Sequence, residues 1–215
     1  MKMINMPFFS VIIPAYNSEK YIRKGLDSIK TQTFTDYELI IVCDSCTDET
    51  EKIAHEYTNK VYKSTYGSAG GSRNIGLDHA QGEWILFMDD DDWWLHEYAF
   101  DILAKKCKNT SDDIVAFSFI YRGSGYATCS KEWIAVWNKA WRRSFINSKP
   151  YRFPETLLWD DVKFHYDIKN IARYTLWDMP LYYYNYGREG SVTVRKERGE
   201  LREQEAAEHK QIYGY

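Results

Sequence analysis

The sequence predicts an α/β fold in which a central, mostly parallel sheet is flanked by helices. Nearly continuous apolar runs, which are typical of strands buried on both faces, alternate along the chain with amphipathic stretches of helical period. Strands separated by helices form βαβ units, and such units place neighbouring strands parallel. At 215 residues the chain is long enough for one domain with a substantial core.

The first half of the chain shows this alternation most clearly. Buried strands are expected in the apolar runs at 8–16, 37–42 and 83–88, with a short strand near 60–63. Helices are expected after Asn17 and Ser18, which can cap one, over roughly 48–57, and from 72 to a stop at Gly82. Each helix therefore connects one strand of the sheet to the next.

The second half is less regular. The expected elements are a strand at 112–122, a helix or turn at 137–146, a loop entering a helix at 154–172, a strand interrupted by Pro180 at 173–186, and a mixed-charge, largely solvated helix from Arg195 to His209. We expect residues 1–194 to form a single domain with two halves, 1–95 and 96–194, followed by a charged helical tail over 195–215.

Polar residues follow the predicted strands at several points. They are Asn17, Asp44, the segment 70–73 and the run from Asp89 to Asp92. Ligands of open parallel sheets collect at the carboxyl ends of the strands. We therefore expect these residues to converge on one edge of the sheet and to form the functional site.

Four consecutive carboxylates, Asp89 to Asp92, follow the third strong strand. On an extended segment alternate side chains share a face, so Asp89 and Asp91 would point one way and Asp90 and Asp92 the other. Such a pair at a strand end suits Mg²⁺ or Mn²⁺, which commonly take one or two carboxylates plus substrate phosphates. The alternative is a solvated acidic loop that caps the next helix, a role for which Asp92 is best placed.

Four segments of the sequence resemble the successive motifs of family 2 glycosyltransferases, which have the Rossmann-like GT-A fold. They are, in order, SVIIPAYN, ELIIVCDSCTD, GGSRNIGLDHAQGEWILFMDDDD and LWDD. Each motif alone is modest, whereas their order and spacing are specific, and the resemblance extends from about Phe9 to Thr193. It implies a nucleotide-sugar-binding half over 1–95 and an acceptor-binding half over 96–194.

The resemblance also implies roles for individual residues on the donor side. Those expected to contact the nucleotide-sugar are Pro14, Ala15, Tyr16, Asn17, Asp44, Arg73 and Asp90. Asp89 and Asp91 match the metal-binding DxD motif, and Asp90 would reach the ribose. Cys43 stands where the family usually has an aspartate that contacts the base, and a thiol is a poor substitute for a carboxylate acceptor.

The catalytic base of the family lies in an acidic pair, which matches Asp160 and Asp161. The resemblance implies that Asp161 takes the proton of the acceptor hydroxyl in a single inverting displacement, and that Asp160 orients it or holds the acceptor. A positioned carboxylate of this kind contributes about 10²–10⁴-fold to the rate. Helix capping is the alternative role for the pair. The arginine that usually follows the family's tyrosine-rich strand has no clear counterpart, and Arg188 or Tyr186 can take its place.

A basic, tryptophan-containing segment over 133–154 is the candidate for the acceptor side. It holds Trp137 and Lys139 and contains no acidic residue. Such a segment can face an anionic acceptor or contact a membrane surface, whereas a purely structural role is equally consistent with the sequence. Trp159, next to the acidic pair, can stack on a sugar ring, although core packing is the commoner fate of a tryptophan.

Cys43 and Cys46 form a C-x-x-C spacing between a strand and a helix. This spacing is typical of thioredoxin-like redox motifs, but two ordinary thiols in a capping loop can share it. Nothing else in the sequence favours a redox fold. Cys107 and Cys129 lack the second paired spacing that a zinc site requires.

Charge and composition limit the class of partner. The formal net charge of −3 argues against nucleic acid as a partner. No apolar run approaches the roughly 20 residues needed to span a bilayer, and the N-terminal apolar stretch lacks a signal-peptide cleavage site. The four cysteines then suggest reduced thiols, which are typical of the cytoplasm. We therefore expect the protein in the cytoplasm, where it can also lie at the inner face of the membrane.

Together with the resemblance, these features predict a metal-dependent inverting glycosyltransferase that uses Mg²⁺ or Mn²⁺. The donor would be a nucleotide-diphospho-sugar, with a UDP-sugar favoured, and the acceptor a hydroxyl of a glycan or of a lipid-linked glycan. The alternative is a noncatalytic module that binds a nucleotide-sugar or carbohydrate on the same fold. Two departures from the family pattern favour this alternative: Cys43, and the arginine after the tyrosine-rich strand that has no clear counterpart.

Overall fold

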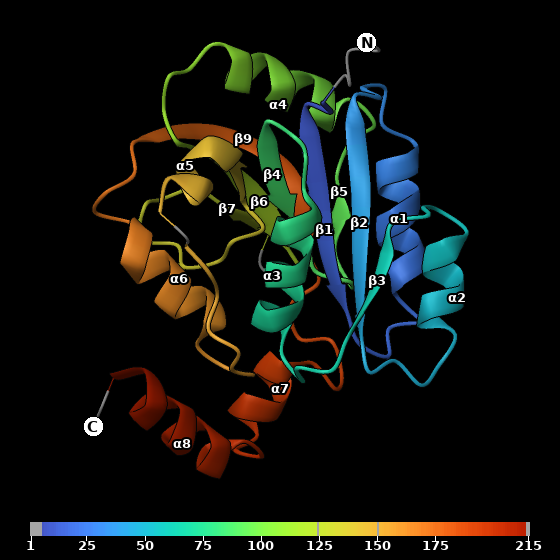
Figure 1. The fold of residues 1–215 in the computed structure, drawn as a ribbon, viewed down its shortest axis with the longest axis vertical. Coiled ribbons are helices and arrows are strands. Elements are labelled where there is room, and N and C mark those ends of the chain that lie inside the picture. Colours follow the sequence, from blue (N-terminus) through green and yellow to red (C-terminus); the bar gives the residue numbers. More distant parts are fainter. Residues whose placement is uncertain (1–5, 124, 150, 214–215) are drawn as a thin grey trace.

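The computed structural model describes residues 6–123, 125–149 and 151–213. Within these residues the strands form one nine-stranded sheet with helices packed on both of its faces (Figure 1). The elements, in chain order, are β1 (Phe9–Ala15), α1 (Ile22–Lys30), β2 (Tyr37–Asp44), α2 (Thr50–His55), β3 (Val61–Ser64), α3 (Ala69–His79), β4 (Trp84–Phe87), β5 (Trp93–Trp94), α4 (Ala99–Lys108), β6 (Ile114–Tyr121), β7 (Gly125–Ala127), β8 (Lys139–Arg142), α5 (Arg143–Ser148), α6 (Asp160–Ile168), β9 (Tyr174–Tyr184), α7 (Val192–Glu197) and α8 (Arg202–Tyr213).

The sheet is parallel through its first four strands and mixed beyond them. β3, β2, β1 and β4 lie in that order and pair in parallel, as the βαβ alternation predicts. β8 runs antiparallel between β4 and β6, while β9 pairs parallel with β6 and antiparallel with β5. The register of β1 on β2 pairs Ala15 with Cys43, so both strands end at the same edge. The predicted α/β class is confirmed.

Alternation along the central strands divides the core between the two faces of the sheet. Ile13 and Ile41 pack on one face with residues of α1 and α4, whereas Ile12 and Ile40 pack on the other face with residues of α3, α5 and α6. Figure 1 shows α3 in front of the sheet and α1 and α2 at its side. Because the central strands are covered on both faces, their sequences are nearly continuous apolar runs.

Two strands of the second half differ from expectation. The segment 137–146, expected as a helix or turn, forms strand β8 followed by the short helix α5. β9 continues through Pro180, where its pairing with β6 shifts register between Phe117 and Phe119. A bulge accommodates proline because the missing N–H would otherwise leave a gap in the ladder of hydrogen bonds. Pairing with neighbouring strands therefore determines where β8 forms and how far β9 extends.

The side chains of Asn17 and Ser18 do not cap helix α1. The helix begins at Ile22, and the Ser18 carbonyl accepts from the backbone N–H groups of Tyr21 and Ile22. Asn17 instead has a left-handed backbone (φ 46°), and its Oδ1 accepts from the N–H of Thr47 at 2.8 Å. Asn17 therefore connects the end of β1 to the loop after β2.

The C-terminal segment is less solvated than its charge pattern predicts. Leu201, between α7 and α8, is buried, and so is Glu208 on α8. The Glu208 carboxylate accepts from the N–H groups of Leu157 and Leu158, at 3.0 and 2.8 Å. α8 thus packs against the loop that leads into α6, and it lies below α6 in Figure 1. The expected domain boundary between 194 and 195 falls inside α7.

Replacing Glu208 with alanine should destabilise the protein by about 1–3 kcal/mol, because the buried N–H of Leu158 and the part-buried N–H of Leu157 would lose their acceptor. Glu203→Ala is the matched control, since it makes the same change at an exposed position of the same helix. Urea denaturation followed by circular dichroism gives the free energy of unfolding of both variants. Equal values would argue against the structural role of Glu208.

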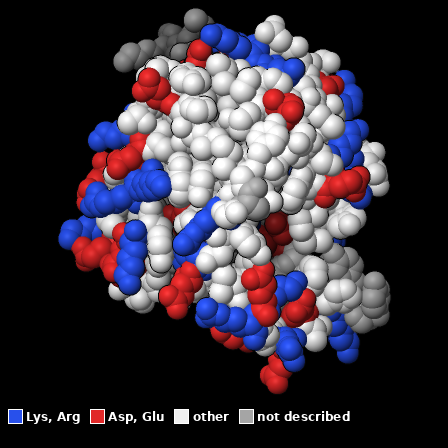
Figure 2. Space-filling model, turned by 180° about the vertical axis from the view of Figure 1, so that it is seen from behind, with Lys and Arg blue, Asp and Glu red and all other residues white. Residues whose placement is uncertain are grey.

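Charged side chains are interspersed on the face opposite to that of Figure 1. Figure 2 shows acidic and basic side chains close together along the edge and lower part of that face, with no continuous basic area. This face therefore offers no extended surface of one charge sign to a polyanion. Across the residues that the structure describes, no helix is both long and apolar enough to cross a membrane.

Candidate active site

The aspartate quartet, Asp89 to Asp92, lies in the connection between β4 and β5, at the carboxyl end of β4. The N–H of Asp92 donates to the carbonyl of Asp89 at 3.2 Å, which closes a four-residue turn. The segment is therefore not extended, and the predicted alternation of its carboxylates between two faces is wrong. Because a turn sends each carboxylate in its own direction, each one has different partners.

Arg188, in the loop after β9, faces the middle of the quartet. Its Nε pairs with Asp91, and its Nη2 lies 3.8 Å from Asp90 Oδ1. Burial raises the pKa of Asp90 to about 7, and Arg188 opposes that rise. Burial likewise raises the pKa of Asp91 against the effect of Arg188. The arginine therefore partly offsets the repulsion within the quartet.

Asp92 anchors the neighbouring strand instead of capping a helix. Its carboxylate is fully buried and accepts from the hydroxyl of Tyr182 and from the N–H of Asn185, both at 2.8 Å. The next helix, α4, begins only at Ala99, so the expected capping role is wrong. Burial raises the pKa of Asp92 well above its ordinary value. The contacts of Asp92 hold β9, and with it the loop that carries Arg188, against the quartet.

Arg73 on α3 connects the quartet to the second acidic pair. Its Nη2 lies 2.7 Å from Asp89 Oδ1, its Nη1 lies 2.5 Å from Asp160 Oδ2, and its side chain is buried. Burial disfavours the guanidinium, but Asp160 and Asp89 outweigh burial and raise the pKa of Arg73. Arg73 thus joins two carboxylates that follow it by 16 and 87 residues.

Asp160 and Asp161 are the first two residues of α6. Trp159 before them has a left-handed backbone (φ 52°), which is uncommon for a bulky residue and typical of functional sites. α3 approaches this turn closely at Gly70, where an added Cβ would lie 2.4 Å from the Pro154 carbonyl oxygen and 2.9 Å from the Asp160 Cβ. Glycine at position 70 therefore permits the contact between the helices that carry Arg73 and the acidic pair.

The two carboxylates of the pair differ in their partners. Asp160 is paired with Arg73, whereas Asp161 accepts from the N–H of Val162 at 2.8 Å and forms no ion pair with any described residue. Burial raises the pKa of Asp160 to about 7, with Arg73 opposing, and burial also raises the pKa of Asp161. The carboxylate of Asp160 is held by the guanidinium of Arg73, whereas Asp161 has no such cationic partner among the described residues, so Asp161 is the better suited of the two to accept a proton.

Tyr16 and Asn17, directly after β1, form the opposite border of the site. The N–H of Tyr16 donates to the Asp90 carboxylate at 3.0 Å, and the ring of Tyr16 is exposed. An exposed ring at the end of a parallel strand can stack on a flat ligand. Pro14 and Ala15 are buried within β1, so a ligand can meet them only at the strand end.

Asp44, at the end of β2, is buried and organises the start of α3. Its carboxylate accepts from the N–H of Ser68 at 2.9 Å and from the hydroxyl of Ser64 at 3.2 Å. Ser68 in turn caps α3, since its hydroxyl accepts from the N–H of Gly71. Asp44 therefore positions the helix that carries Arg73, and its contact with a nucleotide-sugar stays a prediction.

Two of the three residues expected on the acceptor side lie in the interior. Lys139 is fully buried, and its Nζ donates to the carbonyls of Trp133 and Ala135. Trp137 is buried and stacked on Tyr182, with ring centroids 5.0 Å apart. The expectation that these two face an acceptor is wrong, because the strand β8 and the segment before it direct both side chains into the protein.

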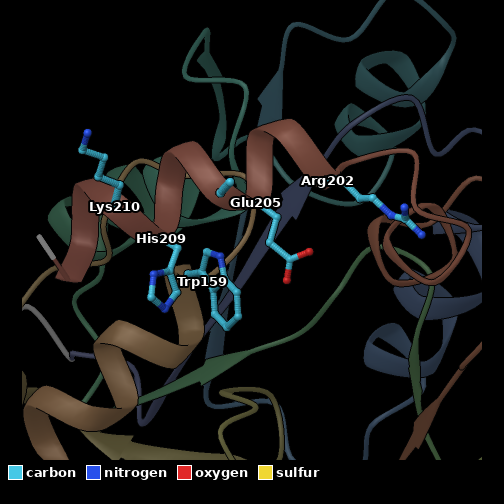
Figure 3. A pocket seen from close by; sticks show the side chains of 6 residues that line it. Trp159, Arg202, Glu205, His209 and Lys210 are labelled. Atoms are coloured by element: carbon cyan, nitrogen blue, oxygen red, sulfur yellow. The ribbon is translucent and has the colours of Figure 1, made fainter. Parts of the chain in front are cut away.

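Trp159, the third of these residues, lines an open pocket of about 610 Å³ against α8. Figure 3 shows Trp159 and His209 next to each other below α8, while Arg202 and Lys210 point away from them. The two rings are edge to face with centroids 5.8 Å apart, and Lys196 lies over the Trp159 ring at 4.2 Å. Trp159 therefore stays a candidate for contact with an acceptor.

Two further residues complete the site, one of which the sequence left open and the other of which it did not single out. Arg188, which the sequence left open against Tyr186, pairs with the quartet, whereas the Tyr186 hydroxyl bonds Glu197 at the surface. The Tyr182 hydroxyl accepts from the N–H of Asp89 at 3.1 Å and donates to Asp92. The tyrosine run in β9 was visible in the sequence, but only the pairing of β9 shows which tyrosine faces the quartet.

The carboxylates of the quartet are the type of ligand that a divalent cation prefers. They do not by themselves form a complete coordination shell around one. Among the described residues, no group of three or more His, Cys, Asp or Glu side chains could hold a metal ion. A cation that binds with a nucleotide commonly takes one or two carboxylates and completes its shell with phosphate oxygens and water. Asp89 and Asp91 can supply these one or two carboxylates. Asp91 would then contact the cation in place of Arg188, its present partner.

The fold and this site define a class of protein. The mixed α/β fold with its curled central sheet matches solved structures of GT-A glycosyltransferases. Residues 10–171 match the family described as Glycosyl transferase family 2. The chain belongs to this family.

Two curated glycosyltransferases and one solved structure are similar to this chain. The chain is 31% identical over 206 residues to the poly(ribitol-phosphate) beta-N-acetylglucosaminyltransferase TarS of Staphylococcus aureus strain Mu50, covering 85% of this chain and 36% of TarS. It is 35% identical over 115 residues to the glycosyltransferase GlyA of Streptococcus pneumoniae serotype 4, covering 51% of this chain and 16% of GlyA. The chain thus spans well under half of the length of either relative.

The solved structure is that of S. aureus TarS 1–349 in complex with UDP-GlcNAc. It superposes with a TM-score of 0.78 at 28% identity, over 86% of this chain and 60% of that one. The predicted family and the predicted GT-A fold are therefore confirmed.

Proposed function

We propose that this chain transfers a sugar from a nucleotide-diphosphate donor to a hydroxyl acceptor in glycan or surface polysaccharide synthesis, with inversion and with a divalent cation. The observation that carries the proposal is the position of Arg73. Its guanidinium bonds Asp89 of the quartet and Asp160 beside the proposed base. One buried residue thus keeps the donor-side and acceptor-side carboxylates within reach of a single pair of substrates.

On the donor side a UDP-sugar is favoured, since the TarS structure that this chain resembles contains UDP-GlcNAc. The exposed ring of Tyr16 can stack on the base, and Asp90, next to the Tyr16 N–H, can accept from a ribose hydroxyl. Arg188 can exchange Asp91 for the diphosphate, which is a stronger partner for a guanidinium. Mg²⁺ or Mn²⁺ held by Asp89 and Asp91 would stabilise the departing diphosphate as a Lewis acid.

On the acceptor side, Asp161 would take the proton of the attacking hydroxyl, so that one displacement inverts the anomeric carbon. Asp160 is held by Arg73 and keeps the start of α6 in place. Trp159 presents an aromatic surface at the pocket beside the pair. The name of TarS, a poly(ribitol-phosphate) transferase, supports a polymeric, hydroxyl-rich acceptor for this chain.

Release of UDP from a panel of UDP-sugars, with and without Mn²⁺ and with glycan or polyol-phosphate acceptors, tests this proposal. We expect one UDP-sugar to give metal-dependent release that an acceptor accelerates. Tight binding of a nucleotide-sugar without release would indicate the noncatalytic module instead, the alternative suggested by Cys43. Neither binding nor release with any nucleotide-sugar would refute both functions.

The pH profile of transfer should report on Asp161. Because burial raises the pKa of this carboxyl, the deprotonated base is lost at a higher pH than for an ordinary aspartate. Activity should be complete above that raised pKa and should fall as the pH is lowered through it. The measurement is kcat against pH at saturating donor. A fall of kcat only near pH 3.9, about the pKa of an exposed aspartate, would contradict this prediction.

A further inference from the structure

We propose that Cys43 and Cys46 form an oxidisable dithiol at the nucleotide site, and that its oxidation to an intrachain disulfide reversibly disables nucleotide binding. The formation of the disulfide is independent of the activity, whereas its effect on binding rests on the proposed function. The pair includes Cys43, the residue that departs from the family's usual aspartate.

The chain places the two cysteines close together within one tight turn. Cys43 lies near the end of β2, opposite Ala15 of β1. Ser45 has a left-handed backbone (φ 53°) and turns the chain so that Cys46 faces back toward the strand. The Cys46 thiol donates to the Ala15 carbonyl oxygen at 3.4 Å, and the Cys43 side chain interacts with that of Cys46 through a hydrogen bond. A shift of the short loop that carries Cys46 is therefore enough to let the two sulfurs bond.

The two thiols differ in access and in acidity, as an attacking and a resolving cysteine do. Cys46 is half-buried, whereas Cys43 is only 3% exposed. The hydrogen bond with Cys43 lowers the pKa of Cys46, although burial and the carboxylates of Asp48 and Asp90 oppose this. The same hydrogen bond and burial raise the pKa of Cys43. Cys46 is therefore the more accessible and the more acidic of the two thiols, and Cys43 is its buried neighbour.

A hydroperoxide is the class of oxidant that this arrangement suits. The Cys46 thiolate attacks one oxygen of hydrogen peroxide, which gives a sulfenic acid and releases hydroxide. The Cys43 sulfur then attacks the sulfenic sulfur, the hydroxyl group leaves with the Cys43 proton as water, and the disulfide forms. In total two thiols lose two electrons, and the peroxide is reduced to two molecules of water. A dithiol reductant such as dithiothreitol reverses the reaction.

Formation of the disulfide would displace one border of the nucleotide site. An S–S bond is about 2.05 Å long, so Cys46 must leave the Ala15 carbonyl and move toward β2. The next residue, Thr47, donates its N–H to the Asn17 side chain, and Asn17 follows the exposed ring of Tyr16. Movement of the loop is therefore transmitted to the residues assigned to the base.

The test uses the purified protein before and after treatment with hydrogen peroxide. Trypsin cleavage after Lys30 and Lys52 leaves both cysteines in one peptide, whose mass should fall by about 2 Da because two hydrogens are lost. Calorimetric titration of the protein with UDP in the presence of Mn²⁺ should show that oxidation weakens the affinity for UDP by at least about tenfold. Dithiothreitol should restore both the mass and the affinity.

Variants are compared by the ratio of UDP affinity before and after peroxide, so that changes in basal affinity cancel. The ratio should fall to one in Cys46→Ser and in Cys43→Asp, which restores the family's usual residue. Cys129→Ser, which removes a buried thiol outside the pair, should respond as the wild type does. A wild-type response in Cys46→Ser would overturn the assignment of the pair.

Other outcomes separate this inference from the proposed function. A disulfide that leaves UDP affinity unchanged would refute the effect on binding, and overoxidation of Cys46 without a disulfide would refute the dithiol. If the reduced protein binds no UDP, the proposed function and the effect on binding both fail. The peptide mass then still decides whether the two cysteines form a disulfide.

Discussion

Replacing Asp161 with asparagine should lower the rate of sugar transfer by about 10²–10⁴-fold while nucleotide binding is retained. Asparagine keeps the shape of the side chain and an oxygen that can accept from the N–H of Val162, as Asp161 does at 2.8 Å. It cannot take the proton of an acceptor hydroxyl. The measurement is kcat at saturating donor and acceptor, with the UDP affinity of the same variant determined in parallel.

Asp167→Asn is the matched control for this variant. Asp167 lies on the same helix, is exposed, and pairs with Lys163 one turn away. The same chemical change there should leave both the rate and the affinity for UDP at their original values. Equal rates in the Asp161 and Asp167 variants would sink the assignment of the base, whereas a joint loss of rate and UDP affinity in Asp161→Asn would place Asp161 on the donor side.

Replacing Arg73 with methionine should destabilise the protein by about 3–5 kcal/mol, because removing one member of a buried ion pair leaves the other without compensation. Two carboxylates, Asp89 and Asp160, would lose their partner at once. Methionine retains the length of the side chain and its packing beside Phe153. The free energy of unfolding in urea measures the effect.

Arg23→Met provides the control for the loss of a guanidinium as such. Arg23 pairs with Glu56 through two hydrogen bonds of 2.7 Å, but both side chains are about half exposed. Exposed pairs contribute little to stability, so this variant should change the free energy of unfolding far less. If the two variants were equally destabilised, Arg73 could not be the buried link between the two acidic clusters.

The strands that are covered on both faces could be predicted from the sequence. β1, β2 and β4 are nearly continuous apolar runs because helices pack on each side of them. β8 was missed because its four residues form a strand only through pairing with β4 and β6, which no local pattern reveals. β9 was expected to break at Pro180, but a bulge in its pairing with β6 absorbs the proline.

The sequence could predict which residues lie near the site when the order of strands and helices along the chain places them there. Arg73 and Asp89 do meet, as the predicted convergence of the segments after the strands implies, whereas the contact of Arg73 with Asp160, at the start of α6, was not predicted. The partners of the other carboxylates depend on side-chain directions that only the packed structure gives. Arg188 reaches the quartet because β9 pairs with β5, and that pairing joins residues about ninety positions apart.

The central claim is that the edge of the sheet beside β1 and β4 binds a nucleotide diphosphate with a divalent cation. Its most direct test is the affinity of the protein for UDP, measured by calorimetry with and without Mn²⁺ in the wild type and in Asp91→Asn. We predict that Mn²⁺ strengthens binding to the wild type, and that the variant loses most of this gain. UDP binding that is absent, or that neither Mn²⁺ nor the substitution changes, would contradict the claim.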